Sequence, residues 1–328
     1  MLGRRLLTIP GYVIAWILCV VAAPVWLPVA VIADLARRNR GVALRSGAFL
    51  TYFFSCEVIG IAISGGLWVW AKILPLDDAK WIDHHHRLEA WWGNSLLNGV
   101  IRIFGLRLEV EDAADLGRGP YLLLIRHTSS ADALLAASLV SRRHGIRLRY
   151  VLKRELLLDP CFDIVGNRLP NVFVDRSSAD SAQEIRRIRE LATDLGPRDG
   201  LLTYPEGTRF SAHKRERVLE RLQREGDEKL LGYARSLRFV LPPRPGGTLA
   251  LLEAAPEVDV VVCNHSGFEG AATLAQIWRG SLVHQTVRVQ FRRIPREEIP
   301  SGREGQLAWL LEEWRRVDAW VASQRSAS

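Results

Sequence analysis

The chain has 328 residues, enough for one large domain with appendages or for two modest domains. Its four cysteines, at positions 19, 56, 161 and 263, show no paired spacing, which excludes a disulfide framework and a cysteine-rich zinc site. The net charge of +8 comes from 39 Arg and 5 Lys, a set that suits anionic lipid headgroups or a phosphorylated substrate. These residues are scattered and form no recognisable nucleic-acid-binding module, so we expect no nucleic-acid partner.

The N-terminal quarter carries two long apolar stretches. Residues 6–33 include no charged side chain, and residues 46–71 include only Glu57. Each stretch exceeds the about 20 residues that a helix needs to cross a bilayer core. We therefore predict an integral membrane protein, with a membrane-anchoring helical hairpin over residues 1–75 and a second domain over residues 76–328.

The topology of this hairpin stays open. A cleaved signal peptide is the competing interpretation of the first stretch, but the apolar run is too long for one and a second run follows it. Pro10, Pro24 and Pro28 make the first helix irregular, and with Glu57 they allow a hairpin that dips into one leaflet instead of two straight spans. Arginines lie both before the first run and in the connector 37–45, so the positive-inside rule alone does not orient it.

Beyond residue 76, strand-like and helix-like segments alternate, which indicates an α/β fold with a central sheet. The predicted strands are 106–110, 121–125, 148–152, 172–174, 201–204, 258–262 and 287–291. The predicted helices are 81–104, 131–143, 178–195 and 306–321, while 219–241 is expected to be irregular. The run 121–125 is apolar throughout, which is typical of a strand covered on both faces.

The run His84-His85-His86 lies within the predicted helix 81–104. Adjacent side chains on a helix point in different directions, and no acidic residue stands at a spacing that would complete a metal site. We therefore expect a solvated or interfacial histidine run and no metal site there.

His127 and Asp132 stand five positions apart, where the apolar run 121–125 stops and a small polar turn follows. This pattern predicts a strand that delivers an imidazole to a loop, then a helix whose first turn carries a carboxylate able to orient the ring. The other ring nitrogen can then take a proton from a hydroxyl. Since the chain has eight His, the spacing alone is weak evidence.

Three further segments place charged groups after predicted strands. They are Lys153-Arg154-Glu155-Leu156 with Pro160, then Val172-Phe173-Val174-Asp175-Arg176, and then Tyr204-Pro205-Glu206-Gly207-Thr208-Arg209. In the last, Gly207 lets the backbone approach a ligand closely, and Arg209 can hold a phosphate through two hydrogen bonds. Strand ends are where α/β sheets place their sites.

The order of these four motifs resembles the glycerolipid acyltransferase superfamily, whose central members acylate 1-acylglycerol-3-phosphate. The resemblance covers about residues 81–247 and extends to the N-terminal hydrophobic pair. It implies a mixed sheet covered by helices, with residues 76–328 as the catalytic domain. It also implies a site on the cytoplasmic face of a membrane, which we expect to be a bacterial inner membrane.

By this resemblance, His127 is the general base that deprotonates the acceptor hydroxyl, and Asp132 orients it. Lys153, Arg176 and Arg209 look like ligands of the acceptor phosphate, while Glu206, Gly207 and Thr208 shape the pocket. The hydroxyl would attack the thioester of acyl-CoA or of an acyl carrier protein directly. No metal and no cofactor beyond this co-substrate is implied.

The sequence departs from the resemblance at two places. Position 126 is Arg where many relatives carry Asn, which alters the hydrogen bonds of the loop or adds a phosphate contact. Cys161-Phe162 stands where Phe-Gly is common. For Glu206 and Arg209, the alternative to a binding role is a structural one, in which the two side chains form a salt bridge that caps the strand.

Three hypotheses follow for the function. The first is acyl transfer to a lysophospholipid, above all 1-acylglycerol-3-phosphate, to give phosphatidic acid. The second is acyl transfer to another lipid acceptor, such as a glycolipid headgroup or an ornithine lipid. The third is a non-catalytic membrane protein that binds anionic lipid. The expected partners are membrane lipids, the lysophospholipid acceptor and the acyl thioester.

Overall fold

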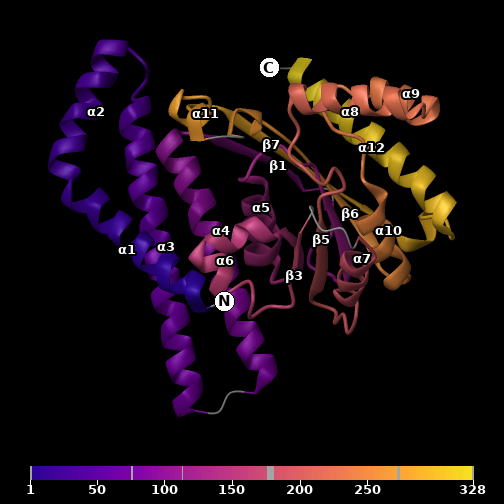
Figure 1. Cartoon of the computed structure of the whole chain (residues 1–328), viewed down its shortest axis with the longest axis horizontal. Coiled ribbons are helices and arrows are strands. Elements are labelled where there is room, and N and C mark those ends of the chain that lie inside the picture. Colours follow the sequence, from indigo (N-terminus) through magenta and orange to yellow (C-terminus); the bar gives the residue numbers. More distant parts are fainter. Residues whose placement is uncertain (1, 75–76, 113, 176–180, 272–273, 327–328) are drawn as a thin grey trace. The chain divides into compact units, whose positions relative to one another are not determined.

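The computed structural model describes residues 2–74, 77–112, 114–175, 181–271 and 274–326, and it interleaves helices with strands (Figure 1). The helices are α1 (Leu2–Val21), α2 (Ala23–Arg37), α3 (Val42–Ile73), α4 (Asp78–Phe104), α5 (Asp132–Leu135), α6 (Pro160–Ile164), α7 (Ser181–Glu190), α8 (Ala212–Glu225), α9 (Glu228–Ser236), α10 (Pro245–Ala254), α11 (Leu274–Trp278) and α12 (Arg303–Ser326). The strands are β1 (Arg107–Asp112), β2 (Tyr121–Ile125), β3 (Arg147–Lys153), β4 (Val172–Val174), β5 (Asp199–Thr203), β6 (Asp259–Ser266) and β7 (Thr286–Ile294). Every strand that the sequence predicts is present.

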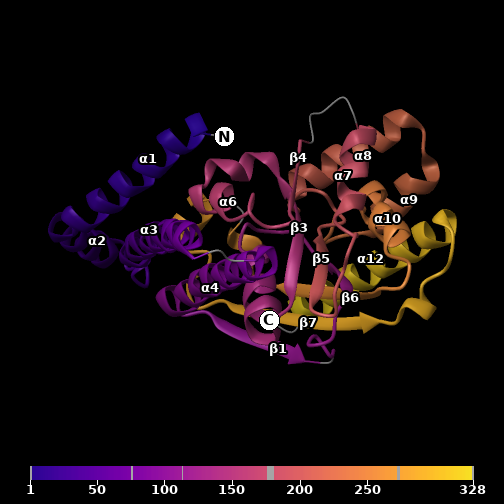
Figure 2. The same cartoon turned by 90° about the horizontal axis from the view of Figure 1, so that it is seen from below.

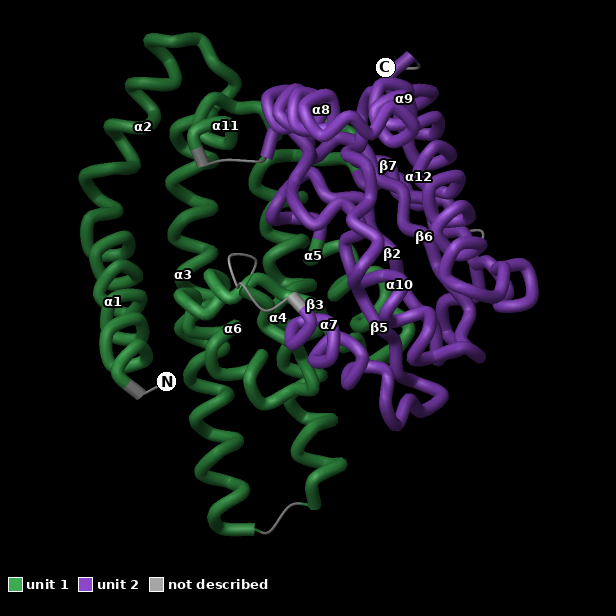
Figure 3. The backbone as a smooth tube through the Cα atoms, turned by 45° about the vertical axis from the view of Figure 1, so that its right-hand side comes forward, with its two compact units in different colours: residues 1–107, 133–178, 273–286 green, residues 108–132, 179–272, 287–328 purple. Residues whose placement is uncertain are grey.

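The chain forms two compact units (Figure 3). The first comprises residues 1–107, 133–178 and 273–286, and the second comprises residues 108–132, 179–272 and 287–328. Both His127 and Asp132 belong to the second unit. The boundary at residue 75 concerns membrane anchoring, and it stays a prediction.

In the first unit, α1 and α2 both contact α3, which runs back beside them (Figure 1). The apolar stretch 6–33 is divided at Ala22, and Pro24 lies in the first turn of α2, so the predicted irregularity is present. A turn at Gly41 starts α3, where the Asp34 carboxylate accepts the backbone N–H groups of Ala43 (2.8 Å) and Leu44 (2.9 Å). This carboxylate caps the new helix N-terminus and thereby fixes the reversal.

Two helical segments are long and apolar enough to cross a membrane. They are Gly3–Val21, with a mean hydropathy of 1.5, and Val42–Ile73, with a mean hydropathy of 1.6. The most apolar part of the first segment has no buried residues. In the most apolar part of the second segment 22% of the residues are buried, because α3 packs against α4. The first segment therefore leaves a wide apolar surface for lipid.

The histidine run in α4 corrects a sequence-based expectation. His85 and His86 are buried, so the run is not a solvated one. His85 donates from Nδ1 to the carbonyl of Trp81 (2.8 Å), and its Nε2 therefore accepts from Arg168 (2.9 Å). Burial lowers the pKa of His85, and the ring serves as a neutral acceptor inside the first unit.

The strands of the second unit pair in the order β1-β7-β6-β2-β5. β2 is parallel to both β5 and β6, whereas β6 and β7 are antiparallel, so the predicted mixed sheet is confirmed. Every residue of β2 is buried, as its continuous apolar run predicts. α12 packs against β6 and α10, and α10 packs against α7 (Figure 2).

The segment 219–241 is not irregular, contrary to the expectation from sequence. α8 and α9 form a helical pair in which Leu222, Leu231 and Ala234 are buried together. Charged residues dominate the rest of α8, so its apolar stripe is narrow. Ser211 and Asp227 cap the two helices through their side chains.

Candidate active site

The site forms where three parallel strands of the second unit end. Ile125 of β2 lies level with Cys263 of β6, and Leu124 lies level with Thr203 of β5. The residues that follow β2 and β5, together with the last residues of β6, therefore emerge at one edge of the sheet. His127, the segment 204–209 and His265 all come from these strand ends.

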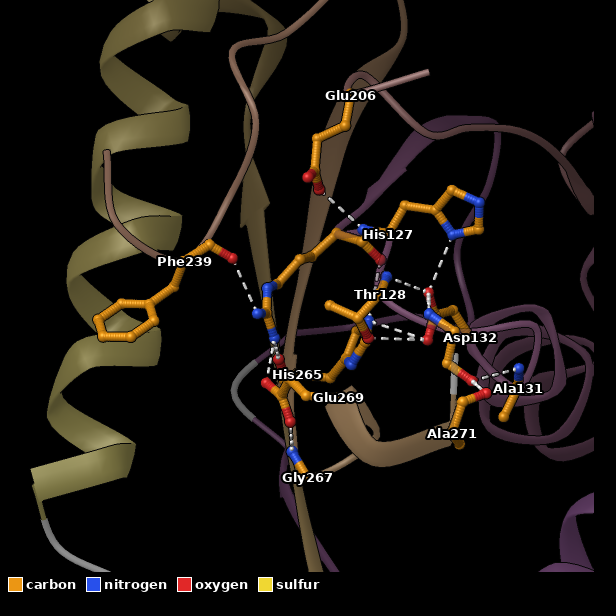
Figure 4. Close-up of polar contacts among 12 residues, drawn as sticks. His127, Thr128, Ala131, Asp132, Glu206, Phe239, His265, Gly267, Glu269 and Ala271 are labelled. Carbon is orange, nitrogen blue, oxygen red and sulfur yellow. Dashed lines mark hydrogen bonds and ion pairs between the residues drawn. The ribbon is translucent and has the colours of Figure 1, made fainter. Parts of the chain in front are cut away.

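His127 and Asp132 form a hydrogen-bonded pair (Figure 4). The Nδ1 atom of His127 lies 3.0 Å from Oδ2 of Asp132, and its Nε2 points away from that carboxylate. Because an ionised carboxylate only accepts, Nδ1 carries the proton and Nε2 is left as the basic nitrogen of the neutral ring. His127 is 14% exposed, whereas Asp132 is fully buried. The His127 imidazole can therefore contact a substrate, while the Asp132 carboxylate is shielded from solvent.

The short turn after β2 holds the Asp132 carboxylate in place. Oδ2 accepts the backbone N–H groups of Thr128 (2.6 Å) and Ser129 (2.9 Å). Burial alone would raise the pKa of Asp132, but His265, His127 and the Ser129 N–H together hold that pKa below its usual range. The carboxylate is thus ionised across the physiological pH range and fixes the ring of His127.

Glu206 ties two loops together. Its Oε1 accepts the N–H of His127 (2.8 Å) and its Oε2 accepts the N–H of Leu241 (2.9 Å). Both oxygens thus bond to backbone, and the alternative of a salt bridge with Arg209 is wrong. Burial raises the pKa of Glu206 to about 8 even though these donors oppose the shift. The Glu206 side chain thus links the backbone at His127 to the backbone at Leu241. It lies in the segment that the sequence predicts to shape the pocket.

The turn after Glu206 exposes a hydroxyl and a cation. Gly207 has a φ of +67° and its N–H donates to the carbonyl of Tyr204 (2.8 Å), a conformation that favours glycine. Arg209 donates to the hydroxyl of Ser130 (3.0 Å), and Thr208 accepts from the Lys214 ammonium (2.8 Å). The site thus includes Lys214, which the sequence reasoning missed although it lies one helical turn beyond the motif.

Lys153 and Arg176 are the other two predicted phosphate ligands. Lys153 ends β3, which pairs with β4 inside the first unit. Arg176 lies outside the described residues. Asp175 accepts from Arg154 (3.3 Å). The roles of Lys153 and Arg176 stay predictions.

Arg126 explains the departure from the Asn that many relatives carry. Its guanidinium is fully buried and donates to the carbonyls of His265 (2.7 Å) and Phe239 (2.9 Å) and to the carboxylate of Glu269 (2.7 Å) (Figure 4). It therefore belongs to the hydrogen bonds of the loop and is not placed to contact an acceptor phosphate. His265 and Glu269 were missed, although His265 ends an apolar run just as His127 does.

Replacing Glu269 with Leu should lower the free energy of unfolding by about 2 kcal/mol, because it leaves the Arg126 charge buried without a counter-ion. The expected loss is smaller than for a fully buried ion pair, because the Glu269 side chain is 22% exposed. Thermal and denaturant unfolding in detergent measure it. The matched control is the double variant Arg126→Met/Glu269→Leu, which should regain part of the loss. Equal stability of the single variant and the wild type would contradict the assignment.

A second group of potential ligands lies in the first unit. Glu57, Asp159 and Cys161 bring their ligand atoms within 4.8 Å of one another. Both carboxylates already serve the fold, since Glu57 accepts from the Trp92 indole (2.8 Å) and Asp159 accepts the N–H of Phe162 (3.1 Å).

Comparison with known proteins agrees with this geometry. The Acyltransferase family model matches residues 107–263, a range that includes His127, Asp132 and the segment 204–209. A mouse (Mus musculus) protein, 1-acyl-sn-glycerol-3-phosphate acyltransferase epsilon, is 27% identical over 207 residues, which cover 60% of this chain. Over this range the chain resembles the glycerolipid acyltransferase superfamily.

A solved structure shares the fold of this chain. The crystal structure of PlsC, the 1-acyl-sn-glycerophosphate (LPA) acyltransferase of Thermotoga maritima, aligns with a TM-score of 0.52. The alignment covers 87% of this chain and 98% of that chain, with 16% sequence identity. The chain spans 56% of the length of the mouse relative.

Proposed function

We propose that this protein transfers a fatty acyl chain from an acyl thioester to a hydroxyl of a lysophospholipid. The acceptor that we favour is 1-acylglycerol-3-phosphate, with phosphatidic acid as the product. The hydrogen-bonded pair of His127 and Asp132 carries this proposal, since it leaves a basic nitrogen at the end of a buried strand. Both similar proteins are named for this acceptor.

The reaction follows from the geometry of the pair. Nε2 of His127 takes the proton of the acceptor hydroxyl while the hydroxyl oxygen attacks the thioester carbonyl carbon. The imidazolium that forms is held by the Asp132 carboxylate. As the tetrahedral intermediate collapses, the C–S bond breaks and the thiolate takes the proton from Nε2. An ester and a free thiol are released, and no acyl-enzyme forms.

The tetrahedral oxyanion requires hydrogen-bond donors. Backbone amides near His127 are natural candidates, but three of them are already engaged. The N–H of His127 donates to Glu206, and those of Thr128 and Ser129 donate to Asp132. We therefore assign the oxyanion to donors outside these three amides.

The decisive experiment is an acceptor panel with the purified full-length chain. It uses one labelled acyl-CoA, and lysophospholipids, a glycolipid, an ornithine lipid and no acceptor form the panel, with free thiol and the product mass as readouts. Acceptor-dependent thiol release with 1-acylglycerol-3-phosphate supports the proposal. Turnover only on another acceptor supports the second hypothesis, and lipid binding without turnover supports the third. Acyl carrier protein thioester in place of acyl-CoA identifies the donor.

Arg209 should contribute to binding the acceptor phosphate. We expect Arg209→Ala to lower kcat/KM for 1-acylglycerol-3-phosphate by about 10–100-fold, the value of a charge-assisted hydrogen bond, and to change kcat/KM for a neutral monoacylglycerol by only a few-fold. Steady-state kinetics on both acceptors measure this difference. Arg217→Ala, in the exposed surface of α8, is the matched control. Equal losses on both acceptors would remove the phosphate role from Arg209.

Membrane association completes the proposal. The two apolar helices and the lipid acceptors of the relatives support a protein that works at a membrane. We place it at a bacterial inner membrane with the catalytic residues on the cytoplasmic side, where acyl thioesters are made. Protease accessibility of α8 in sealed inside-out vesicles and in right-side-out vesicles tests this orientation.

A further inference from the structure

A second histidine lies behind the His127 pair. His265 sits near the end of β6, the parallel neighbour of β2, and its ring is fully buried. Its Nε2 lies 2.9 Å from the carbonyl oxygen of Arg126 and 3.6 Å from Oδ1 of Asp132. His127 and His265 therefore flank the same carboxylate, one on each oxygen (Figure 4).

The hydrogen bonds set the orientation of the His265 ring. A carbonyl oxygen only accepts, so Nε2 of His265 carries a proton and donates it to the Arg126 carbonyl, while the same nitrogen lies 3.6 Å from Oδ1 of Asp132. Arg126 and His265 are joined by a second hydrogen bond, in which the Arg126 guanidinium donates to the carbonyl of His265 (2.7 Å). This reciprocal pair joins the ends of β2 and β6 and leaves the ring little freedom to turn.

The two oxygens of Asp132 are unequally supported. Oδ2 receives His127 and two backbone N–H groups, whereas Oδ1 receives the Thr128 hydroxyl at 3.3 Å and faces His265. The site excludes water here, so the charge on Oδ1 is weakly screened and depends on these two groups. Without His265, Oδ1 would be left with the Thr128 hydroxyl as its one hydrogen-bond donor among these two groups.

We infer that His265 is a positioning residue, which holds the Asp132 carboxylate in the orientation that keeps Nε2 of His127 available as a base. The inference rests on the proposed acyl transfer, because it assigns His265 a part in that reaction. His265 itself touches neither substrate, and it acts only through Asp132. Its removal should therefore lower kcat and leave KM for both substrates within about twofold.

Methionine and glutamine form a matched pair of replacements, since they have nearly the same length and only glutamine offers an N–H. We expect His265→Met to lower kcat by about 10–100-fold, and His265→Gln to restore most of the rate by donating to the Arg126 carbonyl. Thermal unfolding of each variant checks that it is folded. If the methionine variant does not fold, His265→Asn replaces it, because its shorter amide cannot reach the same position.

A double-mutant cycle separates positioning from general support of the fold. If His265 acts through Asp132, then adding His265→Met to Asp132→Asn should cost less than about twofold beyond Asp132→Asn alone. Losses that multiply across the two sites would overturn the inference. Failure of His265→Gln to recover any rate, in a folded protein, would overturn it as well.

A readout without substrate keeps this inference separate from the proposed function. Diethylpyrocarbonate acylates unprotonated imidazole nitrogens, and mass spectrometry gives the rate at each histidine. At pH 8, Asp132→Asn and His265→Met should both slow modification of His127 several-fold, while His265→Gln stays near the wild type. Exposed His213 is the internal control and should not change. If the wild type turned over no acceptor, the proposed function would fail while this measurement still decided the role of His265. Unaltered reactivity of His127 in His265→Met would overturn that role.

Discussion

Replacing His127 with alanine is expected to lower kcat for acyl transfer by about 10²–10⁴-fold, the contribution of a positioned general base. The acceptor hydroxyl would then have to lose its proton to water. KM should change little, because the phosphate and acyl groups are bound elsewhere. The measurement is initial-rate thiol release from acyl-CoA with saturating 1-acylglycerol-3-phosphate.

The control for His127→Ala is His213→Ala, which removes an exposed histidine of α8 and should leave the rate unchanged. A full rate in folded His127→Ala would mean that another group accepts the proton. The hydrogen bond from the backbone N–H of residue 127 to Glu206 is retained in the variant, since alanine has the same N–H. The comparison therefore isolates the imidazole.

Replacing Asp132 with asparagine should be nearly as damaging, with kcat lowered by about 10³-fold. Oδ2 of Asp132 accepts from His127 and from two backbone N–H groups, and an amide has one oxygen to offer in place of two. If the amide oxygen takes the position of Oδ1, which lies near the N–H of His265, the NH₂ group takes the position of Oδ2 and faces Nδ1 of His127. The ring must then accept there and carry its proton on Nε2, where the base is needed.

Two measurements separate this tautomer effect from unfolding. Nitrogen NMR of the imidazole should show the proton of the neutral ring on Nδ1 in the wild type and on Nε2 in Asp132→Asn. Thermal unfolding should show that the variant remains folded near neutral pH. A wild-type rate in the variant would contradict the orienting role of Asp132.

The stability difference between wild type and Asp132→Asn should depend on pH. The pKa of Asp132 lies below its usual range, because its donors and the two histidines outweigh the effect of burial. A carboxyl of this kind stabilises the folded state above its unfolded pKa, and the contribution disappears as pH falls through the folded pKa. The difference in unfolding midpoint should thus be largest near neutral pH and should shrink below about pH 4.

The motifs of the site could be predicted from sequence because each is local. His127 and Asp132 share one turn, and Gly207 to Arg209 share another, so their spacing survives in the linear chain. The strands were predictable for the same reason, since β2 is apolar throughout and covered on both faces. α8 and α9 were missed because a pair of charged helices buries only a narrow stripe.

The amino-acid sequence by itself determined the resemblance to the acyltransferase superfamily, the α/β class and the two apolar helices, since hydrophobic pattern and local motifs are properties of neighbouring residues. Only the tertiary structure decided what surrounds Asp132, because the groups that hold it come from strands far apart in the chain. His265 and Glu206 follow β2 by more than seventy positions, yet parallel pairing brings β6 and β5 to its end. The direction in which Arg126 faces was decided in the same way, because a buried charge must lie where a counter-ion and carbonyl groups can receive it.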